Sequence, residues 1–175
     1  MQRTIFAFLM LLFSTQGFAS TSDLVNQFIE NPQQVGKTSR MTYLFWDVYD
    51  ASLYAPQGAY SQDQPFVLVL HYLRALDGKE IAKRSLEEMQ KQGFSDSSRG
   101  ERWLTKMAQI FPDVSKDTVL LGVRTADGYT QFYQDDKLIG EVKDSEFTTR
   151  FFNIWLGEKT SEPTIRAELL GLKRK

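Results

Sequence analysis

Residues 34–54, QVGKTSRMTYLFWDVYDASLY, form the most strand-like stretch of the chain. They are rich in aromatic and β-branched side chains, which favour extended backbone. Within residues 41–54, both alternating sets of side chains are largely apolar. Because alternating side chains point to opposite faces of a sheet, this pattern predicts one long strand buried on both faces. Such a strand would span about 46 Å, and we expect a bulge near Asp47 or Asp50 to bend it.

The rest of the chain alternates between groups of helices and groups of strands. The pattern predicts helices over 22–30, 77–92, 98–111, 145–156 and 162–170, and strands over 66–74, 118–125, 129–133 and 137–142. Asp77 with Glu80, and Ser98 with Glu101, are typical of capping boxes at helix starts. Short turns join the last three strands as antiparallel hairpins. Strands joined by hairpins, with helices grouped apart, predict a single α+β domain.

Residues 1–19, MQRTIFAFLMLLFSTQGFA, have the order of a secretory signal peptide. A positive residue, Arg3, precedes an apolar run over 5–13, and small residues precede the expected cleavage site. The apolar run is far shorter than the ~20 residues that cross a bilayer. We therefore expect a domain over 20–175 that is periplasmic or secreted and has no transmembrane span, rather than a protein held by an N-terminal anchor.

Composition excludes several classes of site. The chain has no cysteine, so it contains no disulfide, thiolate metal site or cysteine nucleophile. A net charge of −1 argues against a nucleic-acid-binding protein. His71 is the one histidine, which argues against a histidine metal cluster. His71 itself is either a hydrogen-bonded structural histidine or a general base. We expect no metal and no cofactor, and the sequence is silent on oligomeric state.

Four stretches together resemble the chalcone isomerase-like proteins, in particular their secreted bacterial branch. They are residues 36–56, 66–89, 110–114 and 151–171, and their order and spacing match over nearly all of the expected mature chain. The resemblance implies an α+β open-faced β-sandwich, in which a curved antiparallel sheet is covered by a layer of helices. A cleft between the sheet and the helices is part of that expectation.

The resemblance also implies a set of site residues. Plant members cyclise chalcones to flavanones and hold the anionic oxygen with an arginine, and other members bind fatty acids. Arg40 matches that arginine, Tyr49 falls near a threonine of the enzymes, Ile81 takes the place of the catalytic tyrosine, and Glu88 takes that of a helix asparagine. Because isoleucine cannot donate a proton, the plant reaction cannot proceed here in the same way.

Three functions remain open from the sequence. The first is non-enzymatic binding of a small apolar anion, a fatty acid or a phenolic acid, with its head group near Arg40. The second is an isomerase or lyase for an enone-like substrate, in which Arg40 stabilises an oxyanion and Tyr49 or His71 moves protons. The third is an envelope assembly or interaction factor with an exposed apolar patch. Arg40 has a structural alternative as well, which is an ion pair with Asp47 or Asp50.

Overall fold

The computed structural model describes residues 21–173, so the predicted signal peptide over 1–19 lies outside the described residues. The strands are β1 (Pro32–Gln34), β2 (Ser39–Tyr43), β3 (Trp46–Pro56), β4 (Phe66–Tyr72), β5 (Val119–Arg124), β6 (Thr130–Gln134) and β7 (Lys137–Val142). The helices are α1 (Thr21–Val25), α2 (Gly78–Lys91), α3 (Ser97–Ile110), α4 (Ser145–Leu156) and α5 (Pro163–Leu169).

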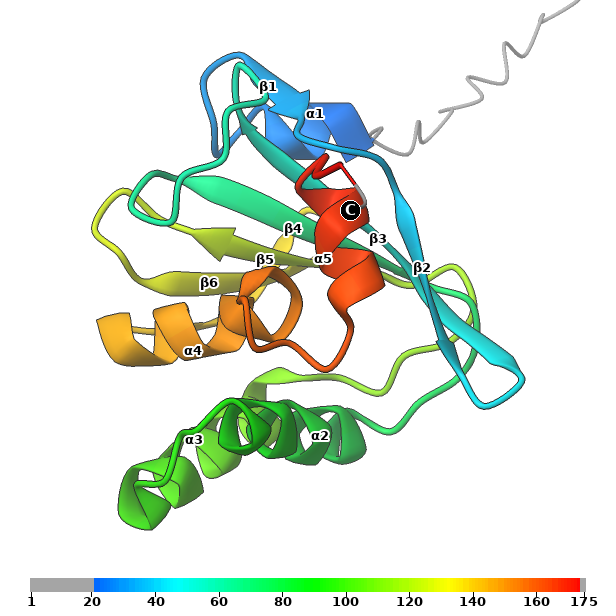
Figure 1. The fold of residues 1–175 in the computed structure, drawn as a ribbon. Coiled ribbons are helices and arrows are strands. Elements are labelled where there is room, and N and C mark those ends of the chain that lie inside the picture. The colour runs from blue at the N-terminus through cyan, green and yellow to red at the C-terminus, as the bar shows by residue number, and fades with distance from the viewer. Residues whose placement is uncertain (1–20, 174–175) are drawn as a thin grey trace, which may run out of the picture.

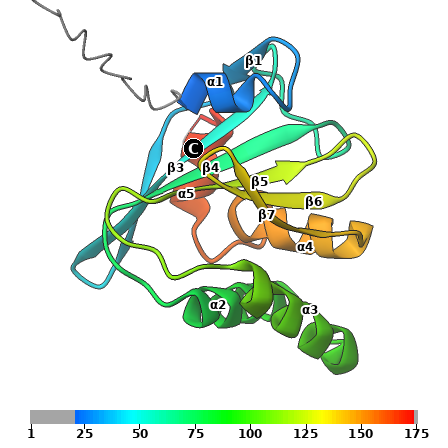
Figure 2. The ribbon, with the colours of Figure 1, turned by 180° about the vertical axis from the view of Figure 1, so that it is seen from behind.

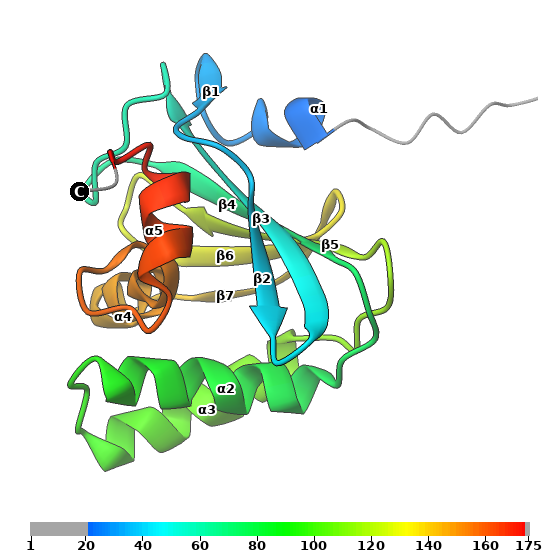
Figure 3. The ribbon, with the colours of Figure 1, turned by 45° about the vertical axis from the view of Figure 1, so that its right-hand side comes forward.

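All strands belong to one antiparallel sheet. Its order is β1-β3-β4-β5-β6-β7, and β2 pairs with β3 alongside β1. Helices α2, α3, α4 and α5 lie together on one side of this sheet (Figure 1 and Figure 3). The predicted fold class, an open antiparallel sheet with a layer of helices, is confirmed.

The two faces of the sheet carry separate apolar clusters. Aromatic side chains of α4 recur at helical spacing and pack on the inner face, where Phe147 and Phe151 stack with ring centroids 5.5 Å apart. On the outer face, Leu24 and Val25 of α1, and Ile29 just after it, pack against strand residues such as Val67. Figure 2 shows α1 at the edge of the molecule opposite α2 and α3. The sequence led us to expect helices on one face of the sheet, and α1 covers part of the other face as well.

The long strand predicted over 41–54 is wrong. Leu44 and Phe45 form a two-residue turn, so β2 and β3 are the two arms of a hairpin in which Tyr43 pairs with Trp46. The prediction equated apolar side chains with burial, but Leu44 and Phe45 are exposed. A bulge does lie beside Asp47: the pairing shifts between Met41 and Thr42, which leaves Val48 of β3 without a partner on β2.

The helix starts were partly predicted. Asp77 caps α2 and accepts backbone N–H groups of Lys79 and Glu80, as its position indicated. The box predicted at Ser98 is wrong, because α3 begins one residue earlier and Asp96 caps it by accepting the N–H of Arg99. Aspartate and serine cap helices about equally well, so local pattern did not separate them. Helix α1 is shorter than predicted because residues 26–30 form turns and bends.

Candidate functional site

A cavity of about 430 Å³ lies between the inner face of the sheet and the helices. Its walls are mostly apolar, with Met41, Leu68 and Leu120 on the sheet side and Ile81, Ile154 and Trp155 on the helix side. Small-molecule sites have volumes of this order. A methylene group is similar in size to a water molecule, which occupies ~30 Å³ in the liquid. The cavity therefore has room for an apolar chain of about a dozen methylene groups.

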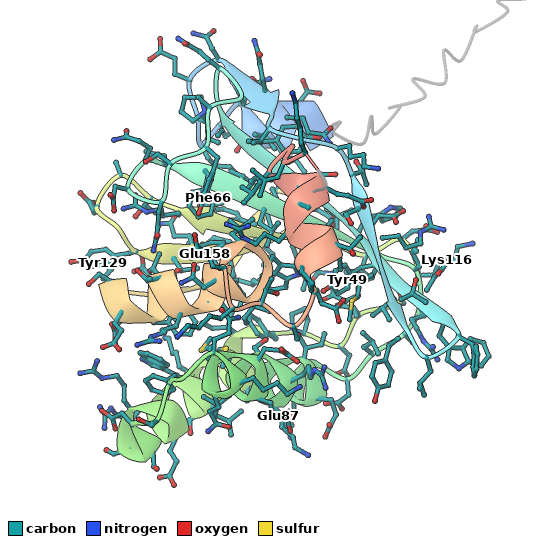
Figure 4. The ribbon with its side chains drawn as sticks, in the orientation of Figure 1. Tyr49, Phe66, Glu87, Lys116, Tyr129 and Glu158 are labelled. Carbon is teal, nitrogen blue, oxygen red and sulfur yellow. The ribbon has the colours of Figure 1, made fainter. Side chains whose placement is uncertain are left out.

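Two tyrosine hydroxyls lie among these apolar walls. Tyr49 of β3 pairs with Tyr72 of β4, and their ring centroids are 5.7 Å apart. Figure 4 shows Tyr49 between the sheet and the helices below it. The indole N–H of Trp155 donates to the Tyr49 hydroxyl at 2.9 Å, and within residues 21–173 neither tyrosine hydroxyl has an acceptor for its own proton. Both can therefore donate a hydrogen bond to a ligand oxygen.

Burial keeps both hydroxyls protonated. It raises the pKa of Tyr49 to about 12, against a lesser opposing effect of the Trp155 hydrogen bond. Burial also raises the pKa of Tyr72, and the neighbouring Tyr49 adds to that shift. At neutral pH the pair is thus a source of two neutral hydrogen-bond donors and not a source of phenolate.

An ionic cluster at Glu88 of α2 forms part of the polar wall of the cavity. The buried Glu88 carboxylate accepts hydrogen bonds from Nζ of Lys91 at 2.9 Å and from the hydroxyl of Ser161 at 2.6 Å, and Nη2 of Arg84 forms an ion pair with it at 2.7 Å. Burial by itself would raise the pKa of Glu88, but the hydrogen bonds from Ser161 and Lys91 and the charge of Arg84 together hold it below the usual range. Two cations share this one carboxylate, so the cluster of three charged groups has an excess positive charge.

Glu162 partly offsets that charge. It also lines the cavity, and its pKa is raised by burial and by repulsion from Glu88. A carboxylate with a raised pKa is one whose charged form is poorly stabilised where it stands. Arg84 is the cation of this cluster that lines the cavity, and Glu80 and Glu87 line it together with Glu88 and Glu162.

Replacing Glu88 with glutamine is expected to lower the free energy of unfolding by about 1–2 kcal/mol at neutral pH, because the charged interactions of the carboxylate with Arg84 and Lys91 are lost. The loss stays modest because both cations are half exposed to solvent. Since the pKa of Glu88 is lowered on folding, its contribution is present above the unfolded-state value of about 4.3 and is lost as the pH falls. Urea unfolding at several pH values measures both effects. Glu87→Gln on the same helix is the control, and equal losses in the two variants would contradict the assignment.

Arg40 lies on the opposite face of the sheet from the cavity. Its Nε and Nη2 donate to the two carboxylate oxygens of Asp50 at 2.8 and 2.9 Å, and Nη1 donates to Asp47 at 3.0 Å. The hydrogen bond and charge of Asp50 raise the pKa of Arg40, and Arg40 in turn lowers the pKa of Asp50. This geometry is the internal ion pair that the sequence left open as an alternative, and it corrects the expected placement of Arg40 at the mouth of the cleft.

His71 shares that outer face. In the register of the sheet it pairs with Asp50, and its Nε2 lies 3.3 Å from a carboxylate oxygen of Asp117. The five residues predicted as one site are therefore divided. Tyr49, Ile81 and Glu88 line the cavity, whereas Arg40 and His71 do not.

Sequence reasoning missed Tyr72, Trp155 and Arg84, which also line the cavity. Arg84 had a local signal, since it lies four residues before Glu88 on the predicted helix and such residues face each other. Tyr72 and Trp155 had none, because their closeness to Tyr49 depends on strand pairing and on the packing of α4.

Two further features of the described residues bear on function. Over residues 21–173, none of the helices has both the length and the apolar character needed to cross a bilayer. In the same range, histidine, aspartate and glutamate side chains do not gather in groups of three or more that could hold a metal ion.

Comparison with known proteins gives a family and a fold. The sequence model of a family described as chalcone isomerase-like matches residues 35–171. Among solved structures, the chain is similar to a fatty-acid-binding protein of Arabidopsis thaliana, with a TM-score of 0.62 and 13% sequence identity. That similarity covers 81% of this chain and 87% of the plant chain, and at this identity it shows a shared fold. The search of curated proteins gave no significant match.

Proposed function

Because the chain belongs to the chalcone isomerase-like family, we propose that it binds a small apolar carboxylate, a fatty acid or a phenolic acid, in the cavity and does not convert it. The observation that carries the proposal is the cavity of about 430 Å³ whose apolar walls meet the Arg84–Glu88 cluster. The fatty-acid-binding plant protein with the same fold supports this choice of ligand class. The signal-like residues 1–19 support a place of action outside the cytoplasm, in the periplasm or the medium.

Arg84 takes over the role that the sequence suggested for Arg40. A guanidinium has five N–H donors, and Arg84 forms its ion pair with Glu88 through one nitrogen, Nη2. The N–H donors of Arg84 suit a ligand carboxylate at this rim. The chain of a fatty acid then lies between the sheet and the helices, and the hydroxyls of Tyr49 and Tyr72 suit a second oxygen such as that of a phenolic acid.

The side chains that line the cavity support the part of the proposal that the bound acid is not converted. Ile81 lines it at the place of the plant enzymes' catalytic tyrosine and has no proton to transfer. The pKa values of Tyr49 and Tyr72 are raised, which keeps both hydroxyls protonated at neutral pH and leaves no phenolate to act as a base. His71, the alternative base, lies on the other face of the sheet.

Replacing Arg84 with glutamine is expected to weaken binding of a medium-chain fatty acid about tenfold, because a charge-assisted hydrogen bond to the carboxylate is lost. Binding of the alcohol with the same chain should change little. Isothermal titration calorimetry measures both ligands. Lys79→Gln is the matched control, since Lys79 is a cation of α2 that lies outside the cavity wall and makes no ion pair among the described residues. An equal loss for the acid and the alcohol would contradict a carboxylate contact at Arg84.

The wider proposal is tested by extraction of the purified protein and mass spectrometry of the extract. An apolar acid should co-purify with the native chain and be absent from Ile81→Trp, in which a larger side chain fills the cavity. If no acid co-purifies, and neither fatty acids nor phenolic acids raise the melting temperature of the native protein, the proposed function fails.

A further inference from the structure

The turn between β2 and β3 presents four consecutive large apolar residues to the solvent. Tyr43, Leu44, Phe45 and Trp46, here called the apolar tip, are 55%, 73%, 95% and 61% exposed. Single exposed apolar residues are common on protein surfaces, but a contiguous group of this kind marks an interaction site. Most of the other large apolar side chains in residues 21–173 are at least partly covered, the exceptions being Leu138 and Leu172.

The apolar tip stands clear of the rest of the sheet. Strand β4 pairs with β3 only from Tyr49 onward, so residues 42–47 form a two-stranded extension (Figure 1 and Figure 3). Leu44 has a φ of 55°, a conformation in which a two-residue hairpin turn normally places glycine, asparagine or aspartate. The backbone of Leu44 is therefore strained, and its side chain is exposed. Backbone strain of this kind is concentrated at functional sites, which points to a role for the leucine side chain.

Two arginines stack against the rings of the apolar tip. The guanidinium of Arg74 lies 4.9 Å from the centre of the Trp46 ring, and that of Arg84 lies 5.8 Å from the centre of the Tyr43 ring. Arg74 makes no ion pair within residues 21–173, and its buried Nε has no hydrogen-bond acceptor there. Its guanidinium therefore contacts the indole ring of Trp46 and no carboxylate of the described chain.

We propose that the apolar tip inserts into the head-group region of a phospholipid bilayer. Tryptophan and tyrosine favour this region because their rings are apolar and their edges are polar, and phenylalanine and leucine reach the acyl chains below it. Arg74 would then lie at the level of the phosphates, where cations gain from anionic lipids. The turn and Arg74 thus form one surface, in which a cation lies beside an apolar end.

The size of the apolar tip favours a bilayer over a protein partner or a second copy of the chain. A stable protein interface takes about 20–30 residues from each side, whereas the apolar tip offers four. The apolar tip is also continuous with the cavity, since Tyr43 and the bulged Val48 belong to the cavity wall. Docking at a bilayer would place the cavity wall next to the lipid surface.

The proposal predicts that Phe45→Ser weakens binding to phospholipid vesicles by about tenfold or more, the factor expected when one large apolar side chain is no longer buried. The probe is a vesicle of zwitterionic phospholipid mixed with anionic phospholipid, and binding is measured by co-sedimentation. Leu138→Ser is the matched control, because Leu138 is an exposed apolar residue of another hairpin. Quenching by lipids brominated in the acyl chain should act on Trp46, since Trp103 and Trp155 are buried.

Three results would overturn the proposal: no binding to the vesicles, equal loss in the Phe45 and Leu138 variants, or a dimer in the absence of lipid that Phe45→Ser dissociates. The last result would assign the apolar tip to a second copy of the chain. Ligand binding in solution is a separate measurement, which Phe45→Ser should leave unchanged because Phe45 is outside the cavity wall. A failure of the bilayer proposal is therefore distinct from a failure of the proposed function.

Discussion

Replacement of Phe151 with alanine is expected to lower the free energy of unfolding by about 3–5 kcal/mol. Phe151 is a buried residue of α4 that packs against the inner face of the sheet. Its ring contacts the rings of Phe111, Phe132, Phe147, Phe152 and Trp155. Truncation would therefore remove dispersion contacts with five aromatic partners at once.

The site of Phe151 is also poorly able to collapse after the truncation. Phe151 lines the existing cavity, so the lost volume adds to empty space, and the cost of a truncation grows with the volume left unfilled. Denaturant unfolding measures the change. Phe45→Ala, at a phenylalanine that is 95% exposed, is the control and should change stability by less than about 0.5 kcal/mol. Similar shifts for the two variants would be incompatible with the aromatic core described here.

A methyl group at Gly78 is expected to destabilise the protein by about 3 kcal/mol, at the upper end of the range for overpacking. Gly78 is the first residue of α2, and a Cβ there would lie 2.3 Å from the carbonyl oxygen of Phe111 and 2.7 Å from the carbonyl carbon of Pro112. These are backbone atoms that cannot rotate away. The N–H of Gly78 also donates to the carboxylate of Asp113 at 2.9 Å, which holds the two segments at close range.

Gly100→Ala on α3 is the control for Gly78→Ala. A Cβ at Gly100 would meet the ring edge of Phe94 at 3.3 Å and a methyl group of Leu86 at 3.4 Å. Both are ends of side chains that can shift, and alanine favours the helix by up to about 1 kcal/mol over glycine. Thermal unfolding should thus separate the variants clearly. A Gly78 variant as stable as the Gly100 variant would show that α2 can move away from the segment after α3.

Much of the fold was predictable because it depends on local rules. Helix α4 has the predicted bounds, residues 145–156, since its aromatic residues recur at helical spacing and Asp144 caps its start. The hairpins from β5 to β7 were predicted from turn residues between short apolar runs. The hairpin of β2 and β3 was not, because its turn contains leucine and phenylalanine in place of the residues that usually mark a turn.

The sequence by itself determined the family, the order of helices and strands from β4 onward, and the presence of Ile81 and Glu88 on one helix. Only the tertiary structure decided which strand residues face the cavity. In a hairpin turning at Leu44 and Phe45 without a bulge, Arg40 would pair with Tyr49 and share its face. The extra residue Val48 shifts the pairing by one, so Arg40 pairs with Asp50 and Met41 with Tyr49. A shift of one residue moves a side chain to the opposite face of a sheet, and this register is set by contacts between strands, which short-range sequence patterns do not encode.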